Sequence, residues 1–249
     1  MIRIKDYEEL KVRIVNWLKD YYWKYDIKAF VVGVSGGIDS AVVSTLCAET
    51  GFPTYVLTMP LHSKKGNTEL SDLHAYGLVK KYSNVTLVNV DLSNTYESLL
   101  FDIDQDFVNN KLANANTKSR LRMVTLYQVA GSVGGIVVGT GNKVEDYGVG
   151  FYTKYGDGGV DIAPIADLYK TEVWELGEYL EVDQRICDAP PTDGLWNDSR
   201  TDEDQLGATY EQLEEAMEKG TGHGVETLEH FSSKNKHKME PIPTFKLRG

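Results

Sequence analysis

The 249-residue sequence has little cysteine and no long apolar run. Its two cysteines, Cys47 and Cys187, have no CxxC spacing, which excludes a cysteine-based zinc module and gives no disulfide framework. The N-terminal stretch lacks the uninterrupted apolar segment of a signal peptide. No run approaches the roughly 18 consecutive apolar residues of a membrane-spanning helix. We therefore expect a cytoplasmic protein that does not bind a membrane.

The sequence also has fewer basic than acidic residues, 26 against 37, which gives a formal net charge of −11. Surfaces that bind nucleic acid usually carry net basic patches, because phosphate neutralisation supplies most of the non-specific affinity. We therefore expect no nucleic-acid partner, whereas a small anionic nucleotide needs only a few local donors. The hydrophobic share of 41% is typical of globular proteins, and the length predicts a single domain over residues 1–249.

The apolar spacing predicts an α/β fold. Helical periodicity covers residues 6–25, 39–50, 68–82, 93–107, 117–132 and 170–180. Short apolar runs predict strands over residues 29–34, 54–59, 85–90 and 135–139. This alternation implies βαβ units, hence a doubly wound, Rossmann-like parallel sheet with helices on both faces. Sites in such folds lie beyond the carboxyl ends of the strands, here residues 35–40, 59–67 and 140–145.

The pattern changes after residue 150. Residues 152–167 are rich in glycine and aspartate and favour a structured loop, and the C-terminal stretch has two short helical patterns. Residues 190–205 are polar and acidic, and we interpret them, with the loop at residues 63–67, as mobile segments that close over ligands.

A glycine-rich loop, Gly33–Ser40 (GVSGGIDS), lies between a predicted buried strand and a predicted helix. Adjacent Gly36 and Gly37 permit positive φ and a close approach to a ligand. The following helix presents free N–H groups and the positive end of its dipole, which together bind phosphate. Asp39 beside a polyphosphate would hold Mg²⁺, although aspartate is also a common helix cap. The loop lacks the lysine of a Walker A motif.

The SGGIDS string resembles the pyrophosphate-binding loop of the ATP pyrophosphatases, which cleave ATP between the α- and β-phosphates. That superfamily includes the GMP, argininosuccinate, asparagine and NAD synthetases and several tRNA-modifying enzymes, and shares an adenine nucleotide alpha hydrolase-like fold. Further strings resemble those of the ammonia-dependent NAD synthetases: NTKSRLRM (116–123), GTGNKVE (139–145), FYTKYGDGG (151–159), Pro191-Thr192 and His237-Lys238. The resemblance extends from about residue 5 to residue 243.

The resemblance implies roles for individual residues. Those implied in ATP binding are Gly33, Val34, Ser35, Gly36, Gly37, Ile38, Asp39, Ser40, Thr140, Lys170 and Thr192. Those implied in contacting deamido-NAD are Arg120, Lys154, Asp161, His237 and Lys238. Asp39 and Glu145 would hold Mg²⁺, and Asp39, Asp157 and Lys170 would serve catalysis. Taken singly, each residue has a plainer interpretation as a surface charge, turn residue or helix cap. The inference therefore depends on all of them occurring together in the order typical of the family.

The segment 146–150 departs from the family pattern, because it makes the spacing between the metal carboxylate and the FYTKYGDGG string one residue longer than usual. Either Glu145 or Asp146 could therefore be the second metal ligand. We favour Glu145 because it keeps its offset from Gly139.

The implied reaction is ATP-dependent amidation. The nicotinate carboxylate of deamido-NAD attacks the α-phosphate, and ammonia then displaces AMP from the acyl-adenylate to give NAD, with Asp157 near the ammonia. The resemblance also implies a homodimer, and the absence of room for a glutaminase domain leads us to expect ammonia as the nitrogen source. Two alternatives are a GMP synthetase or tRNA-modifying relative and a non-catalytic nucleotide-binding regulator. The former would favour a basic surface or extra cysteines, and the latter would not need Glu145, Asp157 and Lys170 together.

Overall fold

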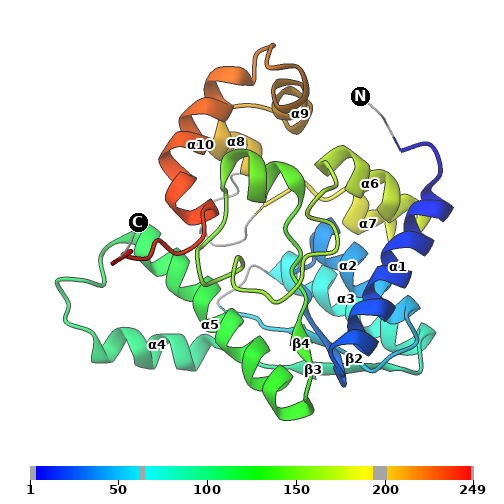
Figure 1. Ribbon diagram of the computed structural model, residues 1–249. Helices are drawn as coiled ribbons and strands as arrows, with labels where there is room; N and C mark the ends of the chain where they lie inside the picture. Colours follow the sequence, from blue (N-terminus) through cyan, green and yellow to red (C-terminus); the bar gives the residue numbers. More distant parts are fainter. Residues whose placement is uncertain (1–3, 62–64, 193–200, 248–249) are drawn as a thin grey trace.

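The computed structural model describes residues 4–61, 65–192 and 201–247, apart from the side chains of residues 65–67. In these residues, four parallel strands form one sheet in the order β3-β2-β1-β4 (Figure 1). They are β1 (Phe30–Gly33), β2 (Thr54–Thr58), β3 (Val85–Asn89) and β4 (Ile136–Val137). Phe30 of β1 pairs with Thr54 of β2 on one side and with Ile136 of β4 on the other.

The strand order creates a switch point at β1. The chain leaves β1 towards β2 and β3, and later returns to place β4 on the opposite side of β1. Connections that leave neighbouring strands in opposite directions open a crevice at their carboxyl ends, where ligands bind in open α/β sheets. The loop after β1 and the segment after β4 both begin at this edge.

Eleven helical segments surround the sheet in the described residues. They are α1 (Tyr7–Lys24), α2 (Ile38–Glu49), α3 (Lys65–Lys81), α4 (Ser93–Asp102), α5 (Lys111–Val133), the π-helix η1 (Lys143–Val149), α6 (Lys170–Tyr179), α7 (Gln184–Cys187), α8 (Asp202–Leu206), α9 (Tyr210–Lys219) and α10 (Val225–Met239). Helix α2 ends before Gly51, whose φ of +78° suits glycine and confirms the predicted helix stop.

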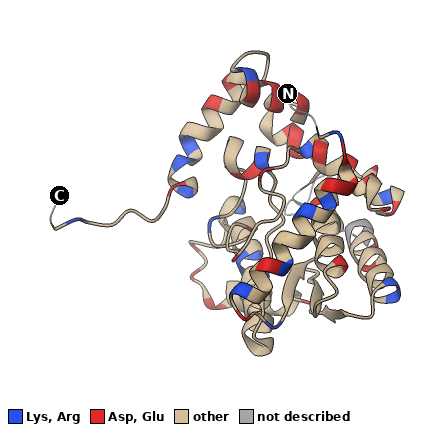
Figure 2. Ribbon diagram, turned by 45° about the vertical axis from the view of Figure 1, so that its right-hand side comes forward, with Lys and Arg blue, Asp and Glu red and all other residues tan. Residues whose placement is uncertain are grey.

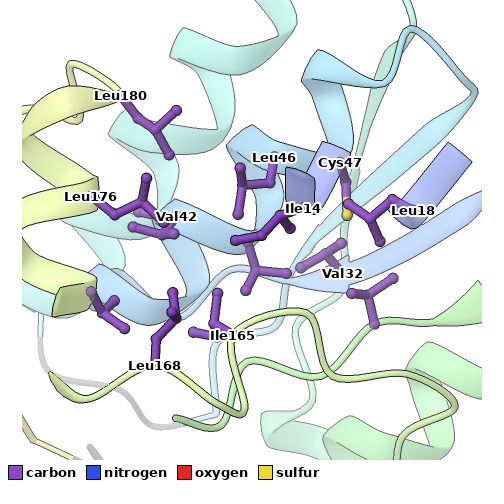
Figure 3. Close-up of a cluster of buried hydrophobic side chains, with 14 of the residues drawn as sticks. Ile14, Leu18, Val32, Val42, Leu46, Cys47, Ile165, Leu168, Leu176 and Leu180 are labelled. Carbon is purple, nitrogen blue, oxygen red and sulfur yellow. The ribbon is translucent and has the colours of Figure 1, made fainter. Parts of the chain in front are cut away.

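Successive side chains of β1 point to opposite faces of the sheet. Both faces are apolar, and helices cover both of them. Val32 packs into a cluster with α1, α2 and α6, in which Leu18 and Leu46 are fully buried (Figure 3). Val31 packs on the other face with α4 and α5, where Ala130 is buried. The predicted doubly wound parallel sheet is therefore confirmed.

The C-terminal helices form a further layer against η1. Val144 and Val149 of η1 are completely buried in one cluster with Leu206 of α8 and Tyr210 and Leu213 of α9. Beyond α10, the chain runs away from the body as an extended segment, and Lys and Arg are dispersed over several helices (Figure 2). Among the described helices, none has the length and apolar character needed to cross a bilayer.

Several predicted boundaries were wrong. The helix predicted over residues 93–107 ends at Asp102, and the one predicted over residues 117–132 begins at Lys111, because the Asn110 side chain accepts a hydrogen bond from Ala113 N and caps it. Only Ile136–Val137 of the strand predicted over residues 135–139 is strand, and Val138 makes an isolated bridge to Ile162.

The two segments predicted to be mobile fall partly outside the described residues. Residues 62–64 and 193–200 are not described. Within the described parts, α3 already begins at Lys65, and α8 occupies the end of the segment predicted as a loop. Thr201 caps α8 by accepting a hydrogen bond from Asp204 N, which explains why an acidic stretch forms a helix there.

Candidate active site

The loop after β1 has the geometry of an anion-binding turn. Gly36 has a φ of +90°, a conformation that favours glycine, and Gly37 is the N-cap residue of α2. Gly37 N and Ser40 Oγ both make hydrogen bonds inside the loop, to Ser35 Oγ (3.2 Å) and Gly37 O (2.9 Å) respectively. No side chain of the described residues caps α2, so the N–H groups of its first turn remain available to a phosphate.

A buried lysine joins two carboxylates at this edge of the sheet. Lys170 Nζ lies 2.6 Å from Asp39 Oδ2 and 3.0 Å from Glu145 Oε1. The Lys170 side chain is 3% exposed, and each carboxylate side chain is 17% exposed. The three side chains come from the starts of α6, α2 and η1, so their convergence depends on how these elements pack.

Close packing of α6 on α2 brings Lys170 to Asp39. A Cβ atom at Gly177 would lie only 2.5 Å from Ile38 Cδ1, so glycine permits the two helices to approach. Lys170 is the first residue of α6, where burial and the positive end of the helix dipole both disfavour a cation. Despite burial, the charges of Asp39 and Glu145 hold the pKa of Lys170 above its usual value.

The two carboxylates share one ammonium, and their pKa values shift in opposite directions. Burial raises the pKa of Asp39 and outweighs the attraction of Lys170. Burial acts on Glu145 in the same sense, but Lys170 and hydrogen bonds from Tyr210 and Asn142 hold the pKa of Glu145 below its usual value. With both carboxylates ionised, the three groups carry one excess negative charge, which suits a further cation.

Two contact residues of this cluster had no assigned role in the sequence analysis. Asn142 is fully buried, donates to Asp39 Oδ1 (3.1 Å) and accepts from Glu145 N (3.1 Å), so it links the Asp39 carboxylate to the backbone of Glu145. The hydroxyl of Tyr210 donates to Glu145 Oε1 over 2.7 Å. Asn142 belongs to the GTGNKVE string and could have been singled out there, whereas nothing in the sequence around Tyr210 marks it.

Glu145, and not Asp146, faces the cluster. Asp146 lies against Gly141, where a Cβ atom would be 2.1 Å from Asp146 Oδ2. Burial, together with the charge of Glu145, raises the pKa of Asp146 to about 8. The extra residue predicted in segment 146–150 falls in a π-helix, whose wider turn accommodates an additional residue and is frequent at functional sites.

Asp157 lies in the turn formed by the FYTKYGDGG string. Its Oδ1 accepts hydrogen bonds from Ser119 Oγ of α5 (2.6 Å) and from Thr153 N (3.0 Å). Burial of the carboxyl group raises the pKa of Asp157, while the residue as a whole is exposed. Asp157 therefore lies at the protein surface, with its carboxylate fixed by the turn.

Four of the residues predicted to contact the substrate are neighbours. Arg120 donates to Lys154 O (3.3 Å), and Lys154 Nζ donates to His237 O (3.1 Å). Lys238 Nζ donates to Tyr152 O (2.8 Å), next to the same turn. The middle of α5 and the end of α10 therefore meet at this turn, and His237 and Lys238 lie in the last turn of α10.

Asp161, Thr140 and Thr192 lie apart from that group. Asp161 Oδ2 accepts from Val137 N (2.7 Å) and its Oδ1 accepts from Tyr127 OH (3.0 Å), so it joins β4 to α5. Thr140 lies between β4 and Asn142, at the carboxyl edge of the sheet. Thr192 is exposed and is the last described residue before residues 193–200.

Comparison with known proteins identifies the family. The NAD synthase family model matches residues 10–242. The chain belongs to the NAD synthase family. It is 38% identical over 239 residues to the NH(3)-dependent NAD(+) synthetase of Carboxydothermus hydrogenoformans, with 94% of this chain and 95% of that protein covered.

Two solved structures are similar to this chain. The NMN synthetase of Francisella tularensis is 32% identical, with a TM-score of 0.90 and coverage of 98% of this chain and 100% of that one. The NH3-dependent NAD synthetase of Campylobacter jejuni is 24% identical, with a TM-score of 0.77 and coverage of 97% and 100%, and it supports the fold alone.

The donor set of this NAD synthase family member fits a magnesium ion. The Asp39 and Glu145 carboxylates both contact the Lys170 ammonium, so they lie close enough to share a cation, and oxygen is the ligand that Mg²⁺ prefers. In the described part of the chain, no group of three or more His, Cys, Asp or Glu side chains could form a complete protein cage. Two carboxylates suffice when substrate phosphates supply other ligands, as is usual for Mg²⁺.

Proposed function

We propose that this protein catalyses the ATP-dependent amidation of deamido-NAD with ammonia, forming NAD, AMP and pyrophosphate. The observation that carries the proposal is the Asp39–Lys170–Glu145 cluster at the start of α2, beside the glycine-rich loop. A buried ammonium between two carboxylates is a costly arrangement that a structural core does not need. With a further cation bound, and at the positive end of a helix, it suits a polyphosphate.

The loop and Lys170 act on ATP. The N–H groups of the first turn of α2 bind phosphate oxygens, and the Lys170 ammonium neutralises charge that develops as pyrophosphate leaves. Preorganised donors of this kind stabilise a transition state without reorganising during the reaction. Thr140 and Thr192 complete the ATP site from the segments that follow β4 and α7.

Asp39 and Glu145 would hold Mg²⁺. The ion supplies Lewis-acid charge at the phosphates when it is bound. Asn142 orients Asp39 through the hydrogen bond to Oδ1, which leaves Oδ2 to face the cation position.

Asp157 acts in the second half of the reaction. Amide formation proceeds through an acyl-adenylate, in which AMP is a competent leaving group for attack by ammonia on the nicotinate carbonyl. The attacking nitrogen must lose a proton, and a positioned carboxylate can accept it. Ser119 and Thr153 N both bond to Oδ1 of Asp157, so Oδ2 is the oxygen that would take the proton.

The substrate site and assembly follow from the same assignment. Arg120, Lys154, Asp161, His237 and Lys238 bind the dinucleotide. The protein acts as a cytoplasmic homodimer, and it uses ammonia directly as the nitrogen donor.

A second substrate with the same reacting group is nicotinic acid mononucleotide. The observation that favours it is the whole-chain similarity, at a TM-score of 0.90, to a protein named as an NMN synthetase. The mononucleotide has the nicotinate carboxylate and lacks the adenylyl half, so the chemistry at Asp39, Lys170 and Asp157 is the same for both acids.

One assay tests both possibilities. Purified protein is incubated with ATP, Mg²⁺ and ammonium, together with deamido-NAD and nicotinic acid mononucleotide at equal concentrations, and the products are identified by mass spectrometry. Predominant NAD with stoichiometric AMP supports the first proposal, and predominant NMN supports the second. Formation of ADP and phosphate, or of neither amide, refutes both. A parallel incubation with glutamine in place of ammonium should give no amide.

A further inference from the structure

Among the described residues, Tyr210 is the largest completely buried side chain, and its hydroxyl lies in the carboxylate cluster. The hydroxyl donates to Glu145 Oε1 over 2.7 Å, and it lies 3.4 Å from Asp202 Oδ2. Lys170 contacts the same Glu145 oxygen (3.0 Å), so two donors fix that oxygen. The other carboxylate oxygen of Glu145 is left to face a ligand.

Neighbouring residues hold the Tyr210 ring rigidly. Trp174 of α6 meets the ring edge-on, with centroids 5.8 Å apart, and Lys170 Nζ lies 5.1 Å from the ring centroid. One turn along α9, the buried Glu214 accepts hydrogen bonds from Thr171 N (3.0 Å) and Thr171 Oγ1 (2.7 Å). Helix α9 is therefore attached to the start of α6 at two consecutive turns, and the hydroxyl has little freedom to move.

The same hydroxyl also faces Asp202, the first residue of α8. Asp202 N donates to Pro191 O (3.0 Å), so the residue before Thr192 lies beside the start of α8. The Asp202 side chain is buried at the start of α8 and points at Tyr210. A phenol has one proton, so it can make its short hydrogen bond to only one of Glu145 and Asp202 at a time.

We propose that Tyr210 is a positioning residue that orients Glu145 for the metal ion and, through Asp202, links the metal site to the neighbourhood of Pro191 and Thr192. This inference rests on the proposed role of Glu145 as a metal ligand. A ligand's hydrogen-bond partners typically change metal affinity by about 10–100-fold when they are removed. Tyr210 touches neither substrate nor metal in this assignment, and acts through Glu145 and Asp202.

The first test is Tyr210→Phe, which keeps the ring and removes the hydroxyl. Mn²⁺ binding to the full-length protein is measured by electron paramagnetic resonance, with and without a non-hydrolysable ATP analogue, so the readout does not need turnover. We expect the Mn²⁺ dissociation constant to rise ~10-fold or more. The Mg²⁺ concentration for half-maximal activity should rise in parallel, whereas the KM for the nicotinate substrate should change less than two-fold.

Tyr82→Phe is the matched control. Tyr82 OH also donates to a carboxylate, that of Glu49, at the opposite end of α2 from Asp39. It should leave Mn²⁺ binding unchanged. An unchanged Mn²⁺ affinity in Tyr210→Phe, or an equal loss in Tyr82→Phe, would overturn the proposal.

Asp202→Asn tests the second half of the inference and does not depend on Tyr210→Phe folding. It keeps the shape of the side chain and removes its charge, so the KM for ATP should rise several-fold while Mn²⁺ affinity without nucleotide stays within two-fold. If neither quantity changes in a folded variant, the link from Asp202 to Thr192 is wrong. If the wild-type protein binds Mn²⁺ but makes no amide, the proposed function fails, while the binding data still decide the role of Tyr210.

Discussion

The ammonium of Lys170 lies 2.6 Å from Asp39 Oδ2, although the two residues are 131 positions apart in the sequence. Their hydrogen-bond partners differ in kind: Lys170 donates to the Asp39 and Glu145 carboxylates, whereas Asp39 also accepts from the Asn142 amide. An ion pair of this degree of burial adds little net stability, because desolvation offsets its Coulombic gain. The ion pair instead fixes charged groups at the position where a charged ligand binds.

Asp39→Asn should abolish most of the activity and leave the fold intact. The amide keeps the shape of the side chain and can still accept from Asn142, but it removes one metal ligand charge. Loss of about 3 kcal/mol of transition-state stabilisation corresponds to a roughly 100-fold fall in kcat/KM. Steady-state assays at saturating Mg²⁺ check this, with circular dichroism as the control for folding. Turnover within a few-fold of wild type would show that Asp39 holds no metal.

Lys170→Met should destabilise the protein in the absence of metal. The variant leaves two carboxylates buried without their counter-charge, and breaking a buried pair in this way costs about 3–5 kcal/mol of unfolding free energy. Mg²⁺ together with an ATP analogue should recover part of this loss in the variant, because the ion takes over the vacated charge. Urea unfolding with and without Mg²⁺ measures both effects. A variant as stable as wild type would mean that the cluster is not ionised as described.

Asp157→Asn should separate the two half-reactions. The amide preserves acceptance from Ser119 and Thr153, so the turn should fold, but Asn cannot take up a proton. Adenylation should therefore continue, with pyrophosphate released once per site, while amide formation falls ~100-fold or more. Rapid-quench measurement of pyrophosphate and amide in the same sample checks the separation. Equal falls in both products would instead make Asp157 part of the ATP site.

The sequence was sufficient to predict that two residues of the candidate site lie close together. Asp39 and Glu145 follow β1 and β4, and parallel strands bring their carboxyl ends to one edge, so topology alone predicts their proximity. The start of α5 could not be predicted in this way, because its first three residues are exposed and give no apolar period. The cap made by Asn110 determines where the helix begins.

Tyr210 illustrates what local sequence could not provide. It lies 65 positions from Glu145, in a helix whose apolar pattern is that of any packed amphipathic helix. Its place in the cluster depends on how α9 docks on α6, and that docking depends on the contact of Glu214 with Thr171. Such tertiary relations leave no periodicity or spacing in the sequence.

A buried histidine away from the active site should make stability pH-dependent. His74 of α3 is 8% exposed, and its Nε2 lies 2.9 Å from Ser44 Oγ of α2. Burial lowers the pKa of His74 from 6.5 to about 4, against the opposing effects of the Ala41 backbone and of Asp183. As the pH falls below 6.5, the unfolded chain takes up a proton at this position and the folded protein does not.

The free energy of unfolding should therefore fall by up to ~1.4 kcal/mol per pH unit between pH 6.5 and about pH 4, a total of ~3 kcal/mol from this residue. His74→Gln keeps a hydrogen-bonding group and cannot titrate, so its unfolding free energy should fall less steeply than that of wild type. Urea unfolding at about pH 7.5 and about pH 5 gives the change in unfolding free energy for each protein. The difference between the two changes isolates His74, because the carboxylates titrate in both proteins and their contribution cancels. His223→Gln, at an exposed position, is the matched control and should follow wild type. Parallel curves for wild type and His74→Gln would show that His74 is protonated inside the folded protein.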